Sequence, residues 1–250
     1  MESVDAYAPA EVAARVTRLG VTKARLPALT LFVLATLAGA FISLGALLFA
    51  VVTTGSTLGF GPTRLLGGIA FCLGLILVVI AGAKLFTGNN LVVMAWASRL
   101  IRLQELLRNW LIVYIGNLIG ALLTVLLCFV GGAHELGAGA VAQTLLSVGT
   151  HKATADPLSL FVLGILCNAL VCMAIWLTQA GHSVVDKVLG IIFPISAFVA
   201  LGFEHCIANM YFLPYAMLLG NWQTRRAQEK EDIAQQIEAQ SKIPVQAATS

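Results

Sequence analysis

The chain has 250 residues, of which 59% are hydrophobic and only 11% charged, and its mean hydropathy is +0.90. Because soluble domains carry about 25% charged residues, this composition excludes a soluble globular protein and predicts an integral membrane protein. The net charge of +3 is small and spread along the chain, which gives no reason to expect nucleic acid binding, and the five cysteines lack the paired spacing of disulfides or metal ligands.

The N-terminal residues 1–26 predict an amphipathic helix that lies on the cytoplasmic surface of the membrane. Pro9 stands at a favourable first helical position, and Val12, Val16 and Leu19 recur at the spacing of one helix face. Basic residues precede the first apolar segment, and by the positive-inside tendency they place this end of the chain in the cytoplasm.

Five apolar segments follow and form the predicted membrane domain, residues 27–220, before a polar C-terminal tail at 221–250. Each is long enough to cross a bilayer as a helix, which takes roughly 20 residues. Basic residues between the second and third segments agree with a cytoplasmic connection there, which leaves the connections at 55–62 and 134–156 outside. The segments are approximately 27–54, 65–97, 109–132, 157–180 and 188–220.

The second and fifth segments are longer than one straight crossing needs, and each contains a polar interruption. In "GAKLFTGNN" and in "GFEHCIANM" a glycine precedes an asparagine by seven positions: Gly82 and Asn89, and Gly202 and Asn209. A glycine before polar residues inside an apolar run predicts a broken helix whose freed backbone groups line a cavity. Two such breaks at corresponding places predict an all-α inverted repeat with a transport site between its halves.

The third segment carries a face of small residues in "YIGNLIGALL", where Gly116 and Gly120 are four positions apart. Small residues at this spacing allow two helices in a membrane to approach closely. A purely structural role in helix packing accounts for both glycines.

Four polar side chains inside apolar segments are candidates for function. An ionisable residue such as His205 is costly within a membrane and usually faces a pathway or a partner. Glu204, about 100° away around a helix, fits an anchor for the break or a subunit contact better than a share in the pathway. The Thr87 hydroxyl either bonds the imidazole or satisfies the broken backbone. Asn168 either joins helices or lines the pathway.

Several motifs in this chain together resemble the formate/nitrite transporter family, most of all its formate channels. They are "GGIAFCLGLILVVIAGAKLFTGNN", "HKAT", "LGILCNALVCMAIW" and "FPISAFVALGFEHCIANMYF", and the resemblance runs from about Pro9 to Leu219. It implies an aquaporin-like protomer of two inverted three-helix repeats, assembled as a homopentamer in the inner membrane with one pore per subunit. It also implies passage of small monovalent anions such as formate, nitrite and hydrosulfide.

The resemblance extends to individual positions. The family's central histidine matches His205, the threonine of its second-segment loop matches Thr87, and its buried asparagine matches Asn168. Its vestibule lysines match Lys23 and Lys152. Its apolar constrictions match Phe71, Leu75, Leu85 and Phe86 on one side and Val171 and Phe198 on the other.

Two features depart from the family pattern. Where the family usually has an acidic residue in the second-segment loop, this chain has Lys84, which we expect to alter gating or anion preference. Where the family has a sixth segment with a second "IGN…IGG" face, this chain has the polar "LLGNWQTRRAQEKEDIAQQIEAQSK". Five crossings would leave the C-terminus, including Ser250, outside, and we expect a pentamer that is less stable than those of six-segment relatives.

These features together predict a channel for small monovalent anions, formate first and nitrite second, in which a central histidine makes passage depend on pH. No cofactor and no enzymatic activity are expected. A neutral-solute channel of the aquaporin kind would share the architecture, but neither break contains an Asn-Pro-Ala turn. A membrane metalloenzyme is the third alternative; its ligands would be His134, His151, His182 and His205, which lack the HExxH spacing.

Overall fold

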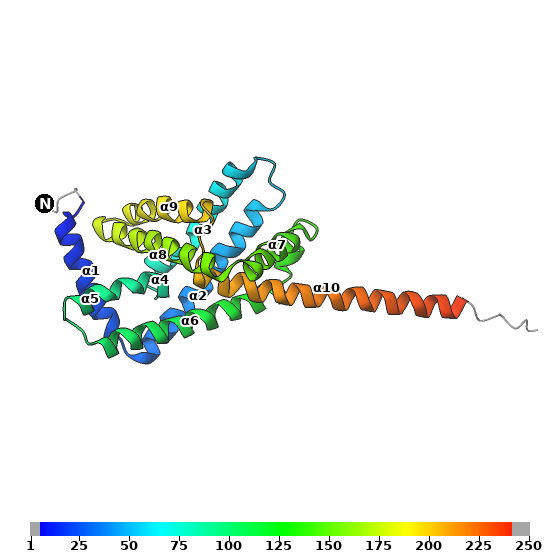
Figure 1. Cartoon of the computed structure of the whole chain (residues 1–250), viewed down its shortest axis with the longest axis horizontal. Coiled ribbons are helices and arrows are strands. Elements are labelled where there is room, and N and C mark those ends of the chain that lie inside the picture. The colour runs from blue at the N-terminus through cyan, green and yellow to red at the C-terminus, as the bar shows by residue number, and fades with distance from the viewer. Residues whose placement is uncertain (1–5, 242–250) are drawn as a thin grey trace, which may run out of the picture.

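The computed structural model describes residues 6–241, with side chains through residue 237, and every regular element in that part of the chain is a helix (Figure 1). The first five residues and the last nine, including Ser250, lie outside the described residues. The elements are α1 (Pro9–Ala24), α2 (Ala28–Thr53), α3 (Phe60–Ile80), α4 (Phe86–Asn89), η1 (Asn90–Val92), α5 (Val93–Ala97), α6 (Leu103–Val130), η2 (Ala133–Glu135), α7 (Ala140–Thr154), α8 (Pro157–Ala180), α9 (Val184–Ala200) and α10 (Cys206–Ser241).

Within residues 6–241, four helices are individually long and apolar enough to cross a membrane: α2, α3, α6 and α8. Their outward faces carry apolar side chains such as Leu111, Leu127 and Phe161, which are exposed in the isolated chain. A helix satisfies its own backbone hydrogen bonds, so apolar side chains on all sides suit a segment that is surrounded by lipid and by other helices. The chain is therefore a multi-pass membrane protein.

Both predicted helix breaks are confirmed. The chain leaves the helical conformation between α3 and α4, and again between α9 and α10. Gly82 and Gly202 adopt φ angles of 72° and 76°, in the left-handed region that favours glycine. After each glycine the next backbone N–H returns to the ending helix, from Ala83 to Val78 and from Phe203 to Phe198. Each break is thus a glycine-dependent helix end followed by a new helix start.

The small face of the third segment packs as expected. Gly116 and Gly120 of α6 lie against α2, where a Cβ atom on Gly116 would meet Ala35 at 2.6 Å and one on Gly120 would overlap the main chain of Thr36. Glycine is therefore required at both positions for α2 and α6 to pack at this distance.

Two parts of the chain differ from the sequence interpretation. The connection at 134–156 was expected to lie outside the membrane, with no helix assigned to it, and it contains α7, whose Gly149 packs against Ala216 of α10. Polar side chains interrupt the apolar pattern of α7, so its sequence does not resemble that of a membrane-spanning segment. The polar tail after residue 220, to which no helix was assigned, continues α10 as one helix to Ser241 and projects beyond the other helices (Figure 1).

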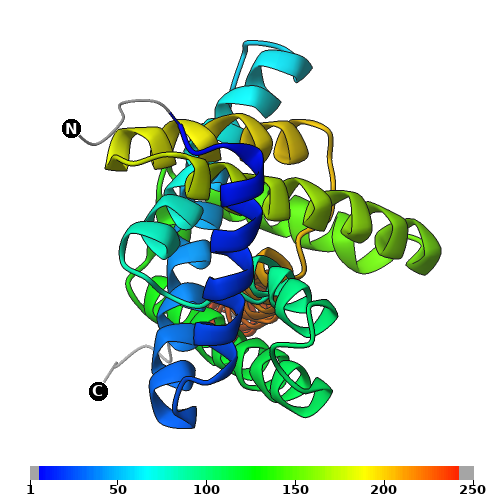
Figure 2. The same cartoon turned by 90° about the vertical axis from the view of Figure 1, so that its left-hand side faces the viewer.

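The N-terminal helix α1 covers one end of the helical bundle (Figure 2). Its buried face consists of Val12, Val16, Gly20 and Ala24. Gly20 lies against Ala95 of α5, so α1 packs on the second half of the broken second segment.

Candidate functional site

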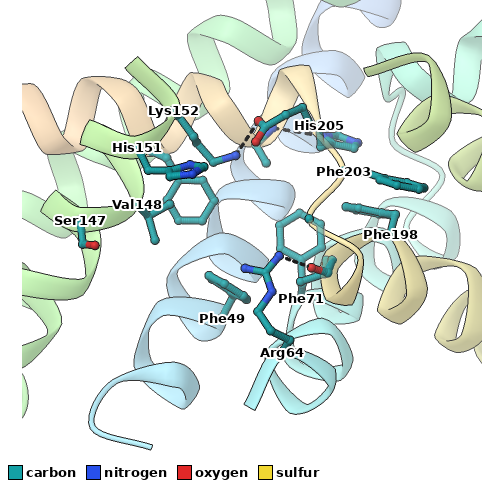
Figure 3. Close-up of a pocket in the computed structure, with 15 residues that line it drawn as sticks. Phe49, Arg64, Phe71, Ser147, Val148, His151, Lys152, Phe198, Phe203 and His205 are labelled. Atoms are coloured by element: carbon teal, nitrogen blue, oxygen red, sulfur yellow. Dashed lines mark hydrogen bonds and ion pairs between the residues drawn. The ribbon is translucent and has the colours of Figure 1, made fainter. Parts of the chain in front are cut away.

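Two cavities approach the helix breaks from different parts of the structure. The first, which we call the Lys152 cavity, has a volume of about 300 Å³; Arg64, His151, Lys152, Glu204 and His205 are among its lining residues (Figure 3). The second, the Lys23 cavity, has a volume of about 230 Å³; Lys23, Lys84, Leu85, Asn89 and Gln179 are among its lining residues. Each cavity therefore contains one of the two lysines singled out in the sequence.

The two breaks meet through one side-chain contact. The Thr87 Oγ1 atom on α4 lies 3.2 Å from the His205 Nε2 atom at the start of α10. Both side chains are buried, with exposed fractions of 3% and 4%. Residues 118 positions apart are thus brought together where each broken helix begins again.

The local backbone settles which nitrogen of His205 carries the proton. His205 immediately precedes α10, and its Nδ1 atom accepts a hydrogen bond of 3.1 Å from the backbone N–H of Ala208. Because a backbone N–H can only donate, Nδ1 must be unprotonated in this arrangement. The neutral ring therefore carries its hydrogen on Nε2 and donates toward Thr87, while Nδ1 serves as the N-cap of α10.

Apolar side chains surround this contact on the side of the Lys152 cavity. The Phe198 ring stacks on the His205 ring at 5.7 Å, and Phe71 lies edge-on to both rings. Leu75, Val171 and Leu85 are buried in the same hydrophobic cluster, with exposed fractions of 2% or less. Of these three, only Leu85 lines the Lys23 cavity, so buried apolar residues separate the two cavities.

Phe86 and Asn168 do not line the Lys152 cavity or the Lys23 cavity; they line a third cavity beside the contact between Thr87 and His205. Phe86 is half-buried against Trp110 and Tyr114 of α6. Asn168 on α8 lies 3.7 Å from the Cys172 sulfur and has a buried Oδ1 atom without a hydrogen-bond partner in the part of the chain that is described. This third cavity has a volume of about 350 Å³ and also reaches Thr87 and Glu204.

Glu204 joins the second break to α7. Its Oε2 atom accepts a hydrogen bond from Lys152 Nζ at 2.6 Å and another from Asn209 Nδ2 at 2.9 Å. The Lys152 and Glu204 side chains are 14% and 11% exposed, so this ion pair is largely removed from solvent. It compensates the charge of Lys152 and fixes the loop that precedes His205.

Lys23 is held by a closed ring of hydrogen bonds. Its Nζ atom donates to Asn89 Oδ1 at 3.0 Å, Asn89 Nδ2 donates to Asn109 Oδ1 at 3.0 Å, and Asn109 Nδ2 donates to the Lys23 carbonyl at 2.8 Å. The ring joins α1 to the first break and to α6. The positions of all three side chains are therefore coupled.

A sequence model of the formate/nitrite transporter family matches residues 10–244. This chain belongs to that family. The formate channel FocA of Escherichia coli strain K12 is 43% identical over 216 residues, which cover 86% of this chain and 76% of FocA. The formate channel BtFdhC of Bacillus thuringiensis is 35% identical over 219 residues, with 86% and 83% covered.

Solved structures agree with this membership of the formate/nitrite transporter family. A structure described as a pentameric formate channel with formate bound superposes with a TM-score of 0.70 at 41% identity, covering 76% of this chain and 74% of that one. A structure described as an FNT family ion channel gives a TM-score of 0.73 at 30% identity, with 82% of each chain covered. The aquaporin-like inverted repeat expected from the sequence is therefore shown.

Sequence reasoning missed two polar residues of this family member that hold the site in place. Asn117 of α6 accepts a hydrogen bond from the Phe86 backbone N–H and donates to the carbonyls of Ala35 and Lys84. Arg64 of α3 lines the Lys152 cavity and donates to the Val199 carbonyl at the end of α9. The asparagine inside "YIGNLIG" was a signal for the first, since a buried amide in an apolar run needs partners.

Proposed function

We propose that this chain forms an inner-membrane, homopentameric channel for small monovalent anions, with formate as the preferred substrate and nitrite as the second. The observation that carries the proposal is the Thr87 and His205 contact, buried between two lysine-containing cavities. The names of the relatives, formate channels and a pentameric formate channel with formate bound, support this substrate and this assembly. The Lys23 cavity faces the cytoplasm in this proposal, in accordance with the basic residues around α1.

The two cavities concentrate anions, and the buried apolar residues between them determine the form in which an anion passes. Lys23 attracts formate electrostatically, and Lys152, which keeps N–H donors beside its ion pair with Glu204, offers the anion hydrogen bonds. A bare carboxylate is far more costly to move out of water than a neutral acid, so the region around Phe71, Leu75 and Val171 favours formic acid over formate. The proton enters with the anion from the water of the cavity.

His205 and Thr87 supply hydrogen bonds at the most desolvated point of the pathway. His205 Nε2–H donates to Thr87 Oγ1, so the Thr87 hydroxyl hydrogen is available to a substrate oxygen. A neutral imidazole held in this tautomer is a poor acid, because its remaining proton sits on Nε2 and Nδ1 is occupied by the Ala208 N–H. The pair therefore stabilises the passing molecule by hydrogen bonding. Protonation of the ring at low pH would place a hydrogen on Nδ1, which could then no longer accept the Ala208 N–H as the N-cap.

Flux measurements with purified protein in liposomes test the proposal. Formate, nitrite, lactate and water are compared at about pH 6 and about pH 8, because the small fraction of formate that is present as formic acid falls about a hundredfold between them. We expect formate to pass fastest, nitrite more slowly and lactate least, with faster formate flux at the lower pH. Rapid water flux without formate flux would instead indicate a neutral-solute channel.

The charge of Lys23 gives a further pH dependence. Burial, followed by the nearby positive charge of Lys84, lowers the pKa of Lys23 to about 8. Below that pH Lys23 is charged and attracts formate, and it loses its proton as the pH rises through about 8 rather than above 10. We expect Lys23→Met to slow formate flux at neutral pH and to match the wild type at about pH 9. At that pH Lys23 is mostly neutral, whereas an ordinary lysine, with a pKa of about 10.4, would still be almost fully charged.

A Lys23→Arg variant is the matched control, since arginine keeps its charge over this range. Its formate flux should lack the part of the decline near pH 8 that the wild type owes to the lost charge of Lys23. If wild type and Lys23→Met differ by the same factor at every pH, then the charge of Lys23 is not what attracts the anion.

A further inference from the structure

The Lys23 cavity has an unbalanced positive charge. Lys23 and Lys84 both line it, and the described residues that line it include no aspartate or glutamate. Neither ammonium group forms an ion pair with a carboxylate in the part of the chain that the structure describes. Both side chains are half-buried, and charges that are partly removed from water are usually paired, so two unpaired ammonium groups at one cavity call for an external anion.

The Lys152 cavity, in contrast to the Lys23 cavity, has a balanced charge at its lysine. There the lysine is paired with Glu204 at 2.6 Å, so its charge is already compensated within the protein. The Lys23 Nζ atom has only the neutral Asn89 amide oxygen at 3.0 Å, and the Lys84 Nζ atom has the Gly82 carbonyl at 2.5 Å. These partners satisfy hydrogen bonds but do not neutralise charge.

Each ammonium group also retains donors. A lysine has three N–H donors, and one of them is used by each of the two contacts just described. The Gln179 amide lines the same cavity, and its nitrogen donates to Thr178 Oγ1 at 3.1 Å. The cavity therefore offers N–H donors from α1, from the first break and from α8, which suits an anion with several acceptor oxygens.

We propose that the Lys23 cavity is a binding site for a doubly charged tetrahedral oxyanion, of the sulfate or hydrogen phosphate type, held between Lys23 and Lys84. Such an anion matches the two positive charges, whereas a monovalent anion matches only one. Burial, and after it the repulsion by Lys84, lowers the pKa of Lys23, and this repulsion is relieved when the site is filled. Because a doubly charged ion is too costly to desolvate at the apolar region, it stays in the cavity and obstructs formate from that side, a consequence that rests on the proposed function.

Binding to the purified full-length protein tests the site without reference to transport. Sodium sulfate and sodium methanesulfonate are titrated by calorimetry, since they share a tetrahedral sulfonyl group but carry two charges and one. We expect sulfate to bind and Lys84→Gln to weaken it by about tenfold or more, because a unit charge a few ångströms from a doubly charged ion is a strong interaction at protein dielectric. Methanesulfonate should bind weakly and respond little to Lys84→Gln.

Two matched variants make the result decisive. Lys84→Arg keeps the charge and should retain sulfate binding, and Lys187→Gln removes a lysine of α9 that does not line the cavity and should have no effect. Equal binding of sulfate to wild type and Lys84→Gln, or no sulfate binding to the wild type, overturns the proposal. Sulfate binding without formate flux would preserve the site and refute the proposed function, and formate flux unaffected by bound sulfate would refute the obstruction.

Discussion

Replacing His205 with phenylalanine is expected to lower formate flux by about tenfold, because a buried polar group that is left without its hydrogen bond costs about 1–3 kcal/mol. The change removes the Nε2–H donor that points toward Thr87 and leaves the Thr87 hydroxyl facing an apolar ring. It also removes the N-cap on the Ala208 N–H, at a cost of about 1 kcal/mol, which is small enough for assembly to survive. Flux in proteoliposomes and elution volume in detergent are the two measurements.

Two further histidine variants separate the possible roles. His205→Asn keeps a polar side chain that caps helices well, so it should retain part of the flux. Because the proton enters with the anion and not from the ring, the remaining flux should still be faster at the lower pH. His151→Phe makes the same exchange at an exposed residue that lines the Lys152 cavity, and it should have a much smaller effect. Wild-type flux and pH response in His205→Phe would show that this histidine has no role in passage.

Replacing Asn117 with leucine is expected to destabilise the protein by about 3 kcal/mol or more, since each buried group left without its hydrogen bond costs about 1–3 kcal/mol. Asn117 bonds the Phe86 N–H at 2.9 Å, the Ala35 carbonyl at 2.8 Å and the Lys84 carbonyl at 2.9 Å. Without the amide, the first break keeps the hydrogen bond from the Lys84 N–H to the Leu34 carbonyl of α2 but loses all three bonds that Asn117 supplies. Thermal unfolding in detergent, followed by the loss of the monodisperse peak, measures the effect.

Asn168→Leu is the matched control, as the same exchange at a second asparagine in a spanning helix. Its amide makes one contact of 3.7 Å with Cys172, and its Oδ1 atom has no partner among the described residues. We therefore expect little loss of stability and, if Asn168 contacts the substrate, an altered flux. Equal unfolding temperatures for Asn117→Leu and the wild type would show that the amide does not hold the break.

The helix breaks were predictable because their cause is local. Gly82 and Gly202 each precede a polar cluster within an apolar run, and glycine is the residue that most readily ends a helix in the left-handed conformation. The pairing of Thr87 with a histidine 118 residues away was one of the two roles that the sequence left open for Thr87, because an inverted repeat brings the two breaks together.

The other features of the site could not be predicted, because they depend on residues that are distant from one another in the sequence. Nothing local indicates that Asn109 closes the ring around Lys23, or that Glu204 pairs with Lys152 of α7. Helix α7 was missed because its packing against α10 requires only a few small and apolar residues, such as Val141 and Gly149, among polar ones. Short amphipathic helices of this kind gain their stability from tertiary contacts rather than from their own sequence.

Formate uptake into proteoliposomes, measured with and without an inside-negative potential set by potassium and valinomycin, tests the central claim most directly. The claim is that formate crosses the apolar region around His205 as the neutral acid. The account predicts uptake well above that of protein-free liposomes and an equal rate with and without the potential, because a neutral molecule does not respond to the field. Uptake no faster than in protein-free liposomes, or uptake that the inside-negative potential suppresses, would contradict the account.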